Sequence, residues 1–301
     1  RSSRRRKFVL AAAVLALSAV AAGAVVSLFV GGTSGQRPSR RNTVASGHLV
    51  LPDRGAQPAG TLARLEAIGY SQIRQLARLG LPIYCGGRRG NEVAFTFDDG
   101  PGPYTYLALR KLRQAGERAT FFDVGRSSRI FPGWLRPELA LGAIGDHTYT
   151  HPDLQLLSDG QIVSQIVATR NALESQTRQR VYLFRPPYGA RDARVDRLVK
   201  RLGLLDVMWS MDSRDSIGAN WRGVVRNVEA GLHPGAIILM HENHGQTIRA
   251  LTTLLPVLHR RHLRSVSLPE LFASDPPSVA QVRKGLEGCG PLRPPPVLTG
   301  G

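Results

Sequence analysis

Eight polar side chains of the types that catalyse hydrolysis occur along the chain. They are two adjacent carboxylates, two histidines four positions apart, one arginine, two further aspartates and a last histidine, namely Asp98, Asp99, His147, His151, Arg185, Asp212, Asp215 and His241. Histidines with this spacing can place both rings on one side of a helical turn or tight loop. Two imidazoles and one carboxylate leave coordination positions open on a zinc ion, as in catalytic rather than structural sites. The set predicts a catalytic metal with further groups that transfer protons.

Each part of this set also has a simpler explanation. A His-x-x-x-His pair occurs as two surface histidines on a helix, and an Asp-Asp-Gly-Pro turn often caps the helix that follows. The position of Asp99 at a predicted strand end favours metal binding by the two histidines, because Asp99 would supply the carboxylate ligand. Neighbouring aspartates on a tight loop can point differently, so one would bind the ion and the other would take a proton from water. Such an ion lowers the pKa of a bound water from about 16 to about 7.

Strands and helices alternate from Asn91 to Phe272 and must position these residues. Predicted strands are Val93–Phe97, Ala119–Val124, Ala143–Gly145, Tyr182–Phe184, Leu205–Met208, Ala236–Met240 and Leu263–Val266. Predicted helices are Tyr104–Ala115, Trp134–Leu141, a long helix opened by a Ser158–Gln161 capping box, Val195–Leu202, Trp221–Ala230 and Thr247–Arg261. Such alternation indicates a parallel sheet. About seven units favour a closed or nearly closed barrel over an open sheet.

The polar residues stand directly after these strands. The aspartate pair follows the first strand, the histidine pair the third, and His241 the apolar strand Ala236–Met240. In a βα barrel the carboxyl ends of the strands form one face, and that face carries the active site. The sequence therefore predicts that all these groups meet in one cleft.

Four segments are similar to motifs of a known family. They are Thr96–Pro101, His147–Pro152, Arg185–Gly189 and Ile238–His241. In order and spacing they resemble four of the five motifs of the polysaccharide deacetylase family, also called the NodB-homology or carbohydrate esterase 4 group. The resemblance covers about Glu92 to Phe272. It implies an α/β fold, a distorted (β/α)7 barrel, and removal of acetyl groups from an N-acetylated sugar polymer with a divalent metal, zinc first, with cobalt or another ion as alternatives.

The resemblance also assigns roles by position. The metal ligands would be Asp99, His147 and His151. Asp98 would be the general base, and His241 would be the general acid that protonates the departing sugar nitrogen. Arg185 would pair with Asp98 and keep it ionised, because a nearby cation favours the carboxylate.

Substrate contacts and the fourth motif complete this assignment. The backbone N–H of Tyr188 would stabilise the oxyanion together with the metal, and Leu239 and Trp209 would line the pocket for the acetyl methyl. The family tends to show an Asp followed directly by Trp, whereas Asp215 is followed by Ser216 here. We expect Asp215 to be the partner of His241, with Asp212 as the alternative. The missing Trp affects the substrate groove more than the chemistry.

The first residues suggest export. Arg1–Lys7 is cationic, and Phe8–Val30 is an uncharged apolar run, longer than the roughly 20 residues that a membrane-spanning helix needs. Positive charge before such a run places the remaining chain outside the cell. A cleaved signal peptide is the alternative, because Ala22-Gly23-Ala24 has the form of a cleavage site. Both alternatives predict an exported protein, anchored in the membrane or secreted.

The formal charge of +18 comes almost entirely from arginine. A basic surface can meet nucleic acid, anionic lipid or an anionic wall polymer, and arginine-rich coding bias is the plainer explanation. Because the sequence resembles no nucleic-acid-binding motif and aromatic residues make up only 6%, nucleic acid is not expected as a partner. The expected partners are a polysaccharide and, through the N-terminal segment, the membrane; we expect a monomer.

Four parts are predicted in the chain. Residues 1–31 form the basic N-terminus and apolar segment, 32–90 a linker with a short amphipathic helix, 91–272 the catalytic domain, and 273–301 a Pro/Gly-rich tail that is extended or poorly ordered beyond Cys289. In an oxidising compartment Cys85 and Cys289 would form a disulfide joining the two ends of the catalytic domain; two free thiols are the alternative.

The predicted function is N-deacetylation of a cell-wall polysaccharide. Peptidoglycan is the first candidate, because an anchored enzyme on a short linker reaches its own wall most easily. Chitin oligomers and acetylated xylan are the alternative substrates. A non-catalytic wall-binding module is the alternative from another class, and the presence of both Asp98 and His241 argues against it.

Overall fold

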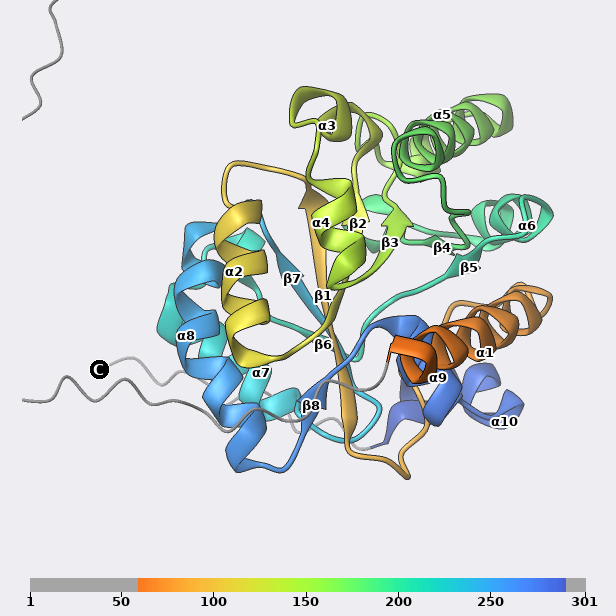
Figure 1. Cartoon of the computed structure of the whole chain (residues 1–301). Coiled ribbons are helices and arrows are strands. Elements are labelled where there is room, and N and C mark those ends of the chain that lie inside the picture. The colour runs from red at the N-terminus through yellow and green to blue at the C-terminus, as the bar shows by residue number, and fades with distance from the viewer. Residues whose placement is uncertain (1–58, 291–301) are drawn as a thin grey trace, which may run out of the picture. The chain divides into compact units, whose positions relative to one another are not determined.

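A curled sheet surrounded by helices forms the part of the chain that the computed structural model describes, residues 59–290 (Figure 1). The strands are β1 (Glu92–Gly100), β2 (Ala119–Asp123), β3 (Gly142–Asp146), β4 (Leu183–Phe184), β5 (Leu205–Asp206), β6 (Met211–Asp212), β7 (Ile237–His241) and β8 (Arg264–Ser265). Their order is β5-β4-β3-β2-β1-β7-β6, and β8 pairs with the start of β1. Every pairing between these strands is parallel.

Ten α-helices of the described residues surround this sheet (Figure 1). They are α1 (Ala59–Ala77), α2 (Thr105–Ala115), α3 (Gly125–Ile130), α4 (Leu135–Ala140), α5 (Asp159–Thr177), α6 (Ala193–Arg201), α7 (Trp221–Gly231), α8 (Gly245–Arg260), α9 (Leu268–Ser274) and α10 (Val279–Arg283). A parallel connection needs such a crossover element to return the chain to the starting edge.

The two edge strands, β5 and β6, follow one another in the chain, and the segment after α1 pairs with the residues next to β5 and next to β7. Ile83 pairs in parallel with Val207, beyond β5, and Cys85 pairs antiparallel with Ala236, at the start of β7. The N–H of Ile83 donates to the carbonyl of Asp206 at 2.9 Å. The sheet therefore curls toward closure, and the predicted α/β fold, a distorted (β/α)7 barrel, is confirmed.

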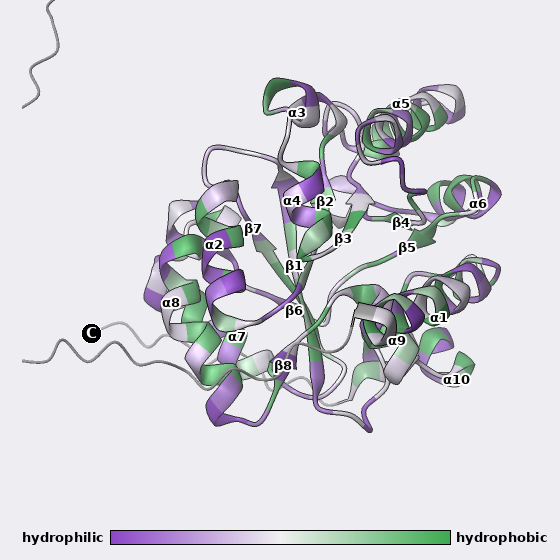
Figure 2. Cartoon of the chain, viewed as in Figure 1, coloured by the Kyte–Doolittle hydropathy of each residue, from purple (hydrophilic) through white to green (hydrophobic). Residues whose placement is uncertain are grey.

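Both faces of the sheet are buried, which explains the composition of its central strands. Val93, Phe95 and Phe97 pack in one cluster with residues of α2, α7 and α8. Ala94, pointing to the other side, packs with residues of α1 and α9. Strands of this kind are apolar at nearly every position. Figure 2 shows hydrophobic residues along these strands and hydrophilic residues on the outer faces of the helices.

Capping residues set several helix ends where the sequence predicts them. The Ser158–Gln161 capping box at the start of α5 is present. Helix α2 ends at Gly116, whose left-handed backbone (φ 67°) favours glycine. A second capping box, Ser267 with Glu270, opens α9, and Pro269 stands in its first turn. Sequence analysis overlooked α9 although both signals are present in the sequence.

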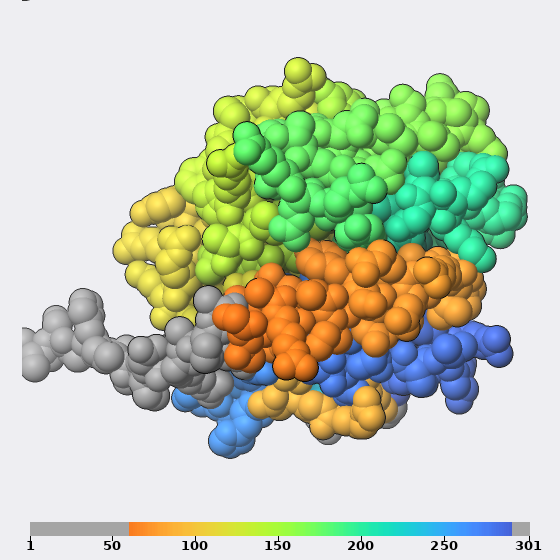
Figure 3. Space-filling view, turned by 45° about the vertical axis from the view of Figure 1, so that its right-hand side comes forward, coloured from red at the N-terminus to blue at the C-terminus, as the bar shows by residue number. Residues whose placement is uncertain are grey.

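Helix α1 and the residues after α9 belong to the folded structure around the sheet. Figure 3 shows α1 (orange) between α5 and α6 on one side and the C-terminal helices (blue) on the other. On α1, Ile73 is fully buried and Leu76 nearly so, so the predicted short amphipathic helix is a 19-residue packed element. The predicted tail includes α10 and ends, in the described residues, near Cys289.

Cys85 and Cys289 form the predicted disulfide, with Cα atoms 5.8 Å apart. It ties the segment that bridges β5 and β7 to the C-terminal end of the described chain. The basic N-terminus, the apolar run, the linker up to residue 58 and residues 291–301 lie outside the described residues. Between residues 59 and 290, no helix combines the length and apolar character needed to cross a membrane.

Candidate active site

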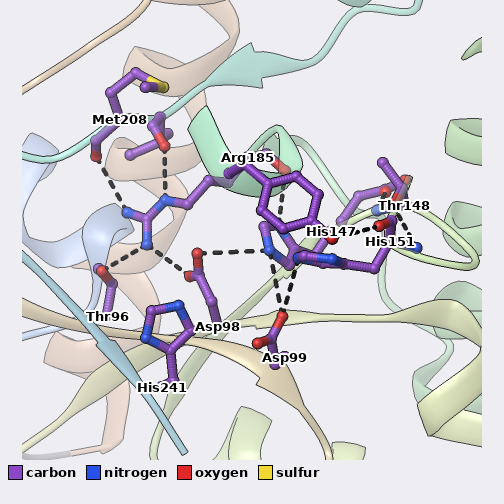
Figure 4. Close-up of polar contacts among 12 residues, drawn as sticks. Thr96, Asp98, Asp99, His147, Thr148, His151, Arg185, Met208 and His241 are labelled. Atoms are coloured by element: carbon purple, nitrogen blue, oxygen red, sulfur yellow. Dashed lines mark hydrogen bonds and ion pairs between the residues drawn. The ribbon is translucent and has the colours of Figure 1, made fainter. Parts of the chain in front are cut away.

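The carboxyl end of β1 carries two aspartates that serve different partners. Asp98 is buried, whereas Asp99 is partly exposed and has a left-handed backbone (φ 69°). Figure 4 shows Asp98 between His241 on one side and the group of Asp99, His147 and His151 on the other. The divergence expected of neighbouring aspartates on a tight loop is therefore present.

Asp99, His147 and His151 offer three candidate metal ligands that all lie within 4.8 Å of one another. The nearest pair is His151 Nε2 and Asp99 Oδ1, at 3.2 Å, and His147 Nε2 lies 3.6 Å from the same oxygen. Left-handed backbone at Thr148 and His151 (φ 65° and 59°) turns the loop after β3 so that both rings face this carboxylate. Two nitrogens and one oxygen at this spacing fit a divalent ion.

The state of His147 also suits metal binding. Its ring Nδ1 lies 2.8 Å from the carbonyl oxygen of Arg185, so Nδ1–H donates there and the Nε2 lone pair remains available. A backbone carbonyl in this position orients a ligating histidine. Burial lowers the pKa of His147 to about 3, which keeps the ring neutral, and neutral imidazole is the form that binds metals.

Arg185 is fully buried and holds Asp98 from one side. Its Nη1 donates to Asp98 Oδ1 at 2.7 Å and to Thr96 Oγ1 at 2.8 Å. The remaining nitrogens donate to backbone carbonyls of Val207 and Met208, and the guanidinium carbon lies 4.1 Å from the ring centre of Phe122. Burial raises the pKa of Asp98, and the charge and hydrogen bond of Arg185 offset part of that rise.

His241, the last residue of β7, pairs with Asp215 rather than with Asp212. Its Nδ1 lies 2.7 Å from Asp215 Oδ1, while Asp212 Oδ1 accepts from the backbone N–H of Arg214 at 2.7 Å. Burial alone would lower the pKa of His241, but the hydrogen bond and charge of Asp215, with the charge of Asp98, raise it to about 9. The imidazole therefore carries a proton at neutral pH.

The residues expected to contact substrate lie close by. Tyr188 has a left-handed backbone (φ 60°) and an exposed side chain whose ring centre lies 4.6 Å from that of His151. Trp209 is partly buried, with its ring centre 5.6 Å from the Arg185 guanidinium carbon. Leu239, on β7 beside Thr96, is buried.

Comparison with known proteins decides the family. The family profile for polysaccharide deacetylases matches residues 86–207. A chitooligosaccharide deacetylase from Azorhizobium caulinodans is 33% identical over 196 residues, which cover 60% of this chain and 93% of that protein. The chain belongs to the polysaccharide deacetylase family.

Two further family members extend the similarity. The peptidoglycan-N-acetylglucosamine deacetylase PgdA of Listeria monocytogenes is 35% identical over 236 residues, 76% of this chain, and the match spans 50% of that relative's length. A structure of the Streptomyces lividans family 4 carbohydrate esterase in complex with acetate superposes with a TM-score of 0.56 at 35% identity, covering 60% of this chain and 92% of that one. Asp215 and His241 lie beyond the residues that the family profile matches, and the structure brings them to the other residues.

Three contacts of this polysaccharide deacetylase site were not predicted. Thr96 accepts from Arg185, Thr247 donates to Asp215 Oδ2, and Asn243 Nδ2 lies 3.4 Å from Asp99 Oδ2. Thr96 lies in the first motif, two residues before Asp98. Its side chain therefore points to the same face of the strand as that of Asp98. No sequence signal identifies Thr247, which reaches Asp215 across 32 positions.

Proposed function

We propose that this protein is a metal-dependent hydrolase that removes N-acetyl groups from a cell-wall polysaccharide. One observation carries the proposal: Asp98 lies between a three-residue metal-binding group and the His241–Asp215 pair (Figure 4). An acid and a base on either side of a reacting amide are what hydrolysis of an N-acetyl group needs. The names of the relatives support the reaction class.

Asp99, His147 and His151 would hold the metal, and zinc is the first candidate because it favours nitrogen ligands with an open position. When bound, the ion lowers the pKa of a water and polarises the acetyl carbonyl. Cobalt or another divalent ion is the alternative. The donor set of two imidazoles and one carboxylate fits all of these ions.

Asp98 would take the proton from the attacking water. Its Oδ1 is held by Arg185 at 2.7 Å, while Oδ2 lies 3.6 Å from His147 Nε2 and faces the metal-binding group. Oδ2 is therefore the oxygen that accepts the proton. Arg185 fixes the orientation of the carboxylate.

His241 would then give its proton to the departing sugar nitrogen. Because Nδ1 is bonded to Asp215, the proton that moves is the one on Nε2. The C–N bond breaks as the nitrogen is protonated, and the products are acetate and a free amine. The Tyr188 N–H would donate to the oxyanion, and Leu239 and Trp209 would contact the acetyl methyl.

Peptidoglycan is the substrate we place first, because relatives named for it match the larger part of this chain. Chitin oligomers follow from the named relative in Azorhizobium, and acetylated xylan is a further alternative. We also propose that the protein is exported, anchored or secreted through its N-terminal segment, and acts as a monomer.

The basic surface would retain the enzyme on an anionic wall. A cavity of about 550 Å³ between α1, α5 and α6 is lined by one carboxylate, Glu174, and by five cationic side chains, namely Arg74, Arg78, Arg170, Arg180 and Lys200. No ion pair among residues 59–290 neutralises these five. Binding of the full chain to isolated walls should fall steeply with added salt; salt-insensitive binding would remove this idea.

The function is tested by acetate release from purified peptidoglycan, chitin oligomers and acetylated xylan, measured side by side. The proposal predicts chelator-sensitive acetate from one of the three. Wall binding without any acetate, from protein that holds its metal, would favour a non-catalytic binding module instead.

A further inference from the structure

Three carboxylates from three different elements meet behind the active-site loop. Asp123 ends β2, Glu138 lies on α4, and Glu242 follows β7. All three side chains are fully buried, and one oxygen from each lies within 4.8 Å of the others. None of the three belongs to the metal-binding group of the active site.

Most oxygens of this carboxylate cluster have no hydrogen-bond partner among the described residues. As ionised groups, which can only accept, both oxygens of Asp123, both oxygens of Glu138 and Oε2 of Glu242 have no donor. The one exception is Glu242 Oε1, which accepts from Thr105 Oγ1 at 2.6 Å. No arginine or lysine between residues 59 and 290 forms an ion pair with any of the three. Ionised carboxylates in this state are too unfavourable to remain without compensation.

The negative charge of the buried carboxylates can be neutralised in two ways, by protonation or by a bound cation. Burial and mutual repulsion raise the pKa of Asp123 and of Glu138, and these two lie within hydrogen-bonding reach of each other. One shared proton would link this pair. This shared proton would leave Glu242 Oε2 and the other oxygens of Asp123 and Glu138 without partners. It would therefore neutralise only part of the charge of the cluster.

A hard cation fits all three groups at once. Calcium binds carboxylate oxygens at about 2.3–2.6 Å, so two oxygens on one ion are at most about 5 Å apart. One oxygen from each side chain lies within 4.8 Å of the others, which is compatible with this maximum. The cluster offers oxygen ligands only, which distinguishes it from the nitrogen-containing group of the active site. We propose that Asp123, Glu138 and Glu242 bind a second divalent cation of the calcium type.

The position of the cluster gives this cation a role. A Cβ at Gly100 would lie 2.2 Å from Glu242 Oε1 and 2.8 Å from Asp123 Oδ1. The carboxyl end of β1, which carries Asp98 and Asp99, therefore packs directly against the cluster. A cation there fixes this end of the strand from behind, whatever substrate the enzyme uses.

The test is the metal content and calcium response of the full chain. Purified protein, loaded with zinc and calcium and then freed of unbound ions, should hold one calcium besides one zinc by elemental analysis. Saturating calcium should raise the melting temperature by roughly 5 °C. Glu138→Gln should lose the calcium and that shift, keep the zinc, and bind calcium at least about tenfold more weakly in titration.

Controls keep the two metal sites apart. Glu229→Gln, on α7, should retain both ions, and His151→Ala should lose zinc but keep calcium. A wild-type chain that binds no calcium, and that Glu138→Gln stabilises, would overturn the proposal in favour of a shared proton. Calcium lost with His151→Ala would also overturn it, because the ion would then belong to the active site. If Glu138→Gln does not fold, the wild-type titration still decides.

Discussion

Asp215 and His241 are joined twice, by a side chain and by the backbone. Asp215 Oδ1 lies 2.7 Å from His241 Nδ1, and Oδ2 accepts the backbone N–H of His241, also at 2.7 Å. Burial alone would raise the pKa of Asp215, but these bonds and one from Thr247 lower it. The carboxylate therefore stays ionised and keeps one proton on Nδ1 of the ring, so the second proton of the charged imidazole, the one that can be transferred, lies on Nε2.

Replacing this partner should shift the pH profile. Asp215→Asn removes the charge that helps to raise the pKa of His241 to about 9. A general acid works only while it is protonated, so activity falls as pH rises through its pKa. The basic limb of kcat/KM should move to lower pH in the variant, and kcat should fall at least about tenfold. Asp212→Asn, at the end of β6, should shift the limb much less, and equal shifts would refute the pairing.

Arg185 should matter for stability as well as for rate. Arg185→Met leaves Asp98 buried without its cation, and breaking a buried ion pair costs about 3–5 kcal/mol. Unfolding in urea should show that loss together with a loss of acetate release. Arg185→Lys keeps the charge but lacks the planar fork that reaches Thr96 and the carbonyl of Val207. It should recover part of the stability and little of the activity; a fully active Lys variant would contradict this role.

The disulfide should stabilise the barrel rather than the chemistry. Cys85 and Cys289 are separated by 204 positions, and removing a bond that closes a loop of this size costs about 2–5 kcal/mol. Cys85→Ser with Cys289→Ser should lower the free energy of unfolding by that amount, measured by denaturant unfolding, while kcat stays near that of the parent. A collapse of kcat in the folded double variant would show that the segment from Ile83 to Cys85 also shapes the site.

Much of the site could be predicted because its residues follow strands. Asp98, His147 and His241 each stand at the carboxyl end of an apolar run, and in a parallel barrel these ends share one face. The partner of His241 could not be fixed in this way. Asp212 ends β6 and Asp215 follows three positions later, and only the course of the backbone decides that the N–H of Arg214 bonds to the first and the N–H of His241 to the second.

Other features depend on contacts that the sequence does not encode locally. Glu138 lies on α4, a helix that the sequence predicts, but it meets Asp123 and Glu242 only after folding. Helix α3 was missed because six residues are too few to show a periodic pattern. Helix α1 shows clear periodicity, but its packing against α9 is a contact between segments about 200 positions apart that no local pattern predicts.

The central claim is tested most directly by acetate release from purified peptidoglycan by the zinc-loaded full chain, with chelator and Asp98→Asn as the two controls. The account predicts acetate release that chelator abolishes and zinc restores. Asp98→Asn should keep its zinc while losing activity by about 10²–10⁴-fold, the usual contribution of a general base. Acetate release that survives in Asp98→Asn with zinc bound would contradict the account.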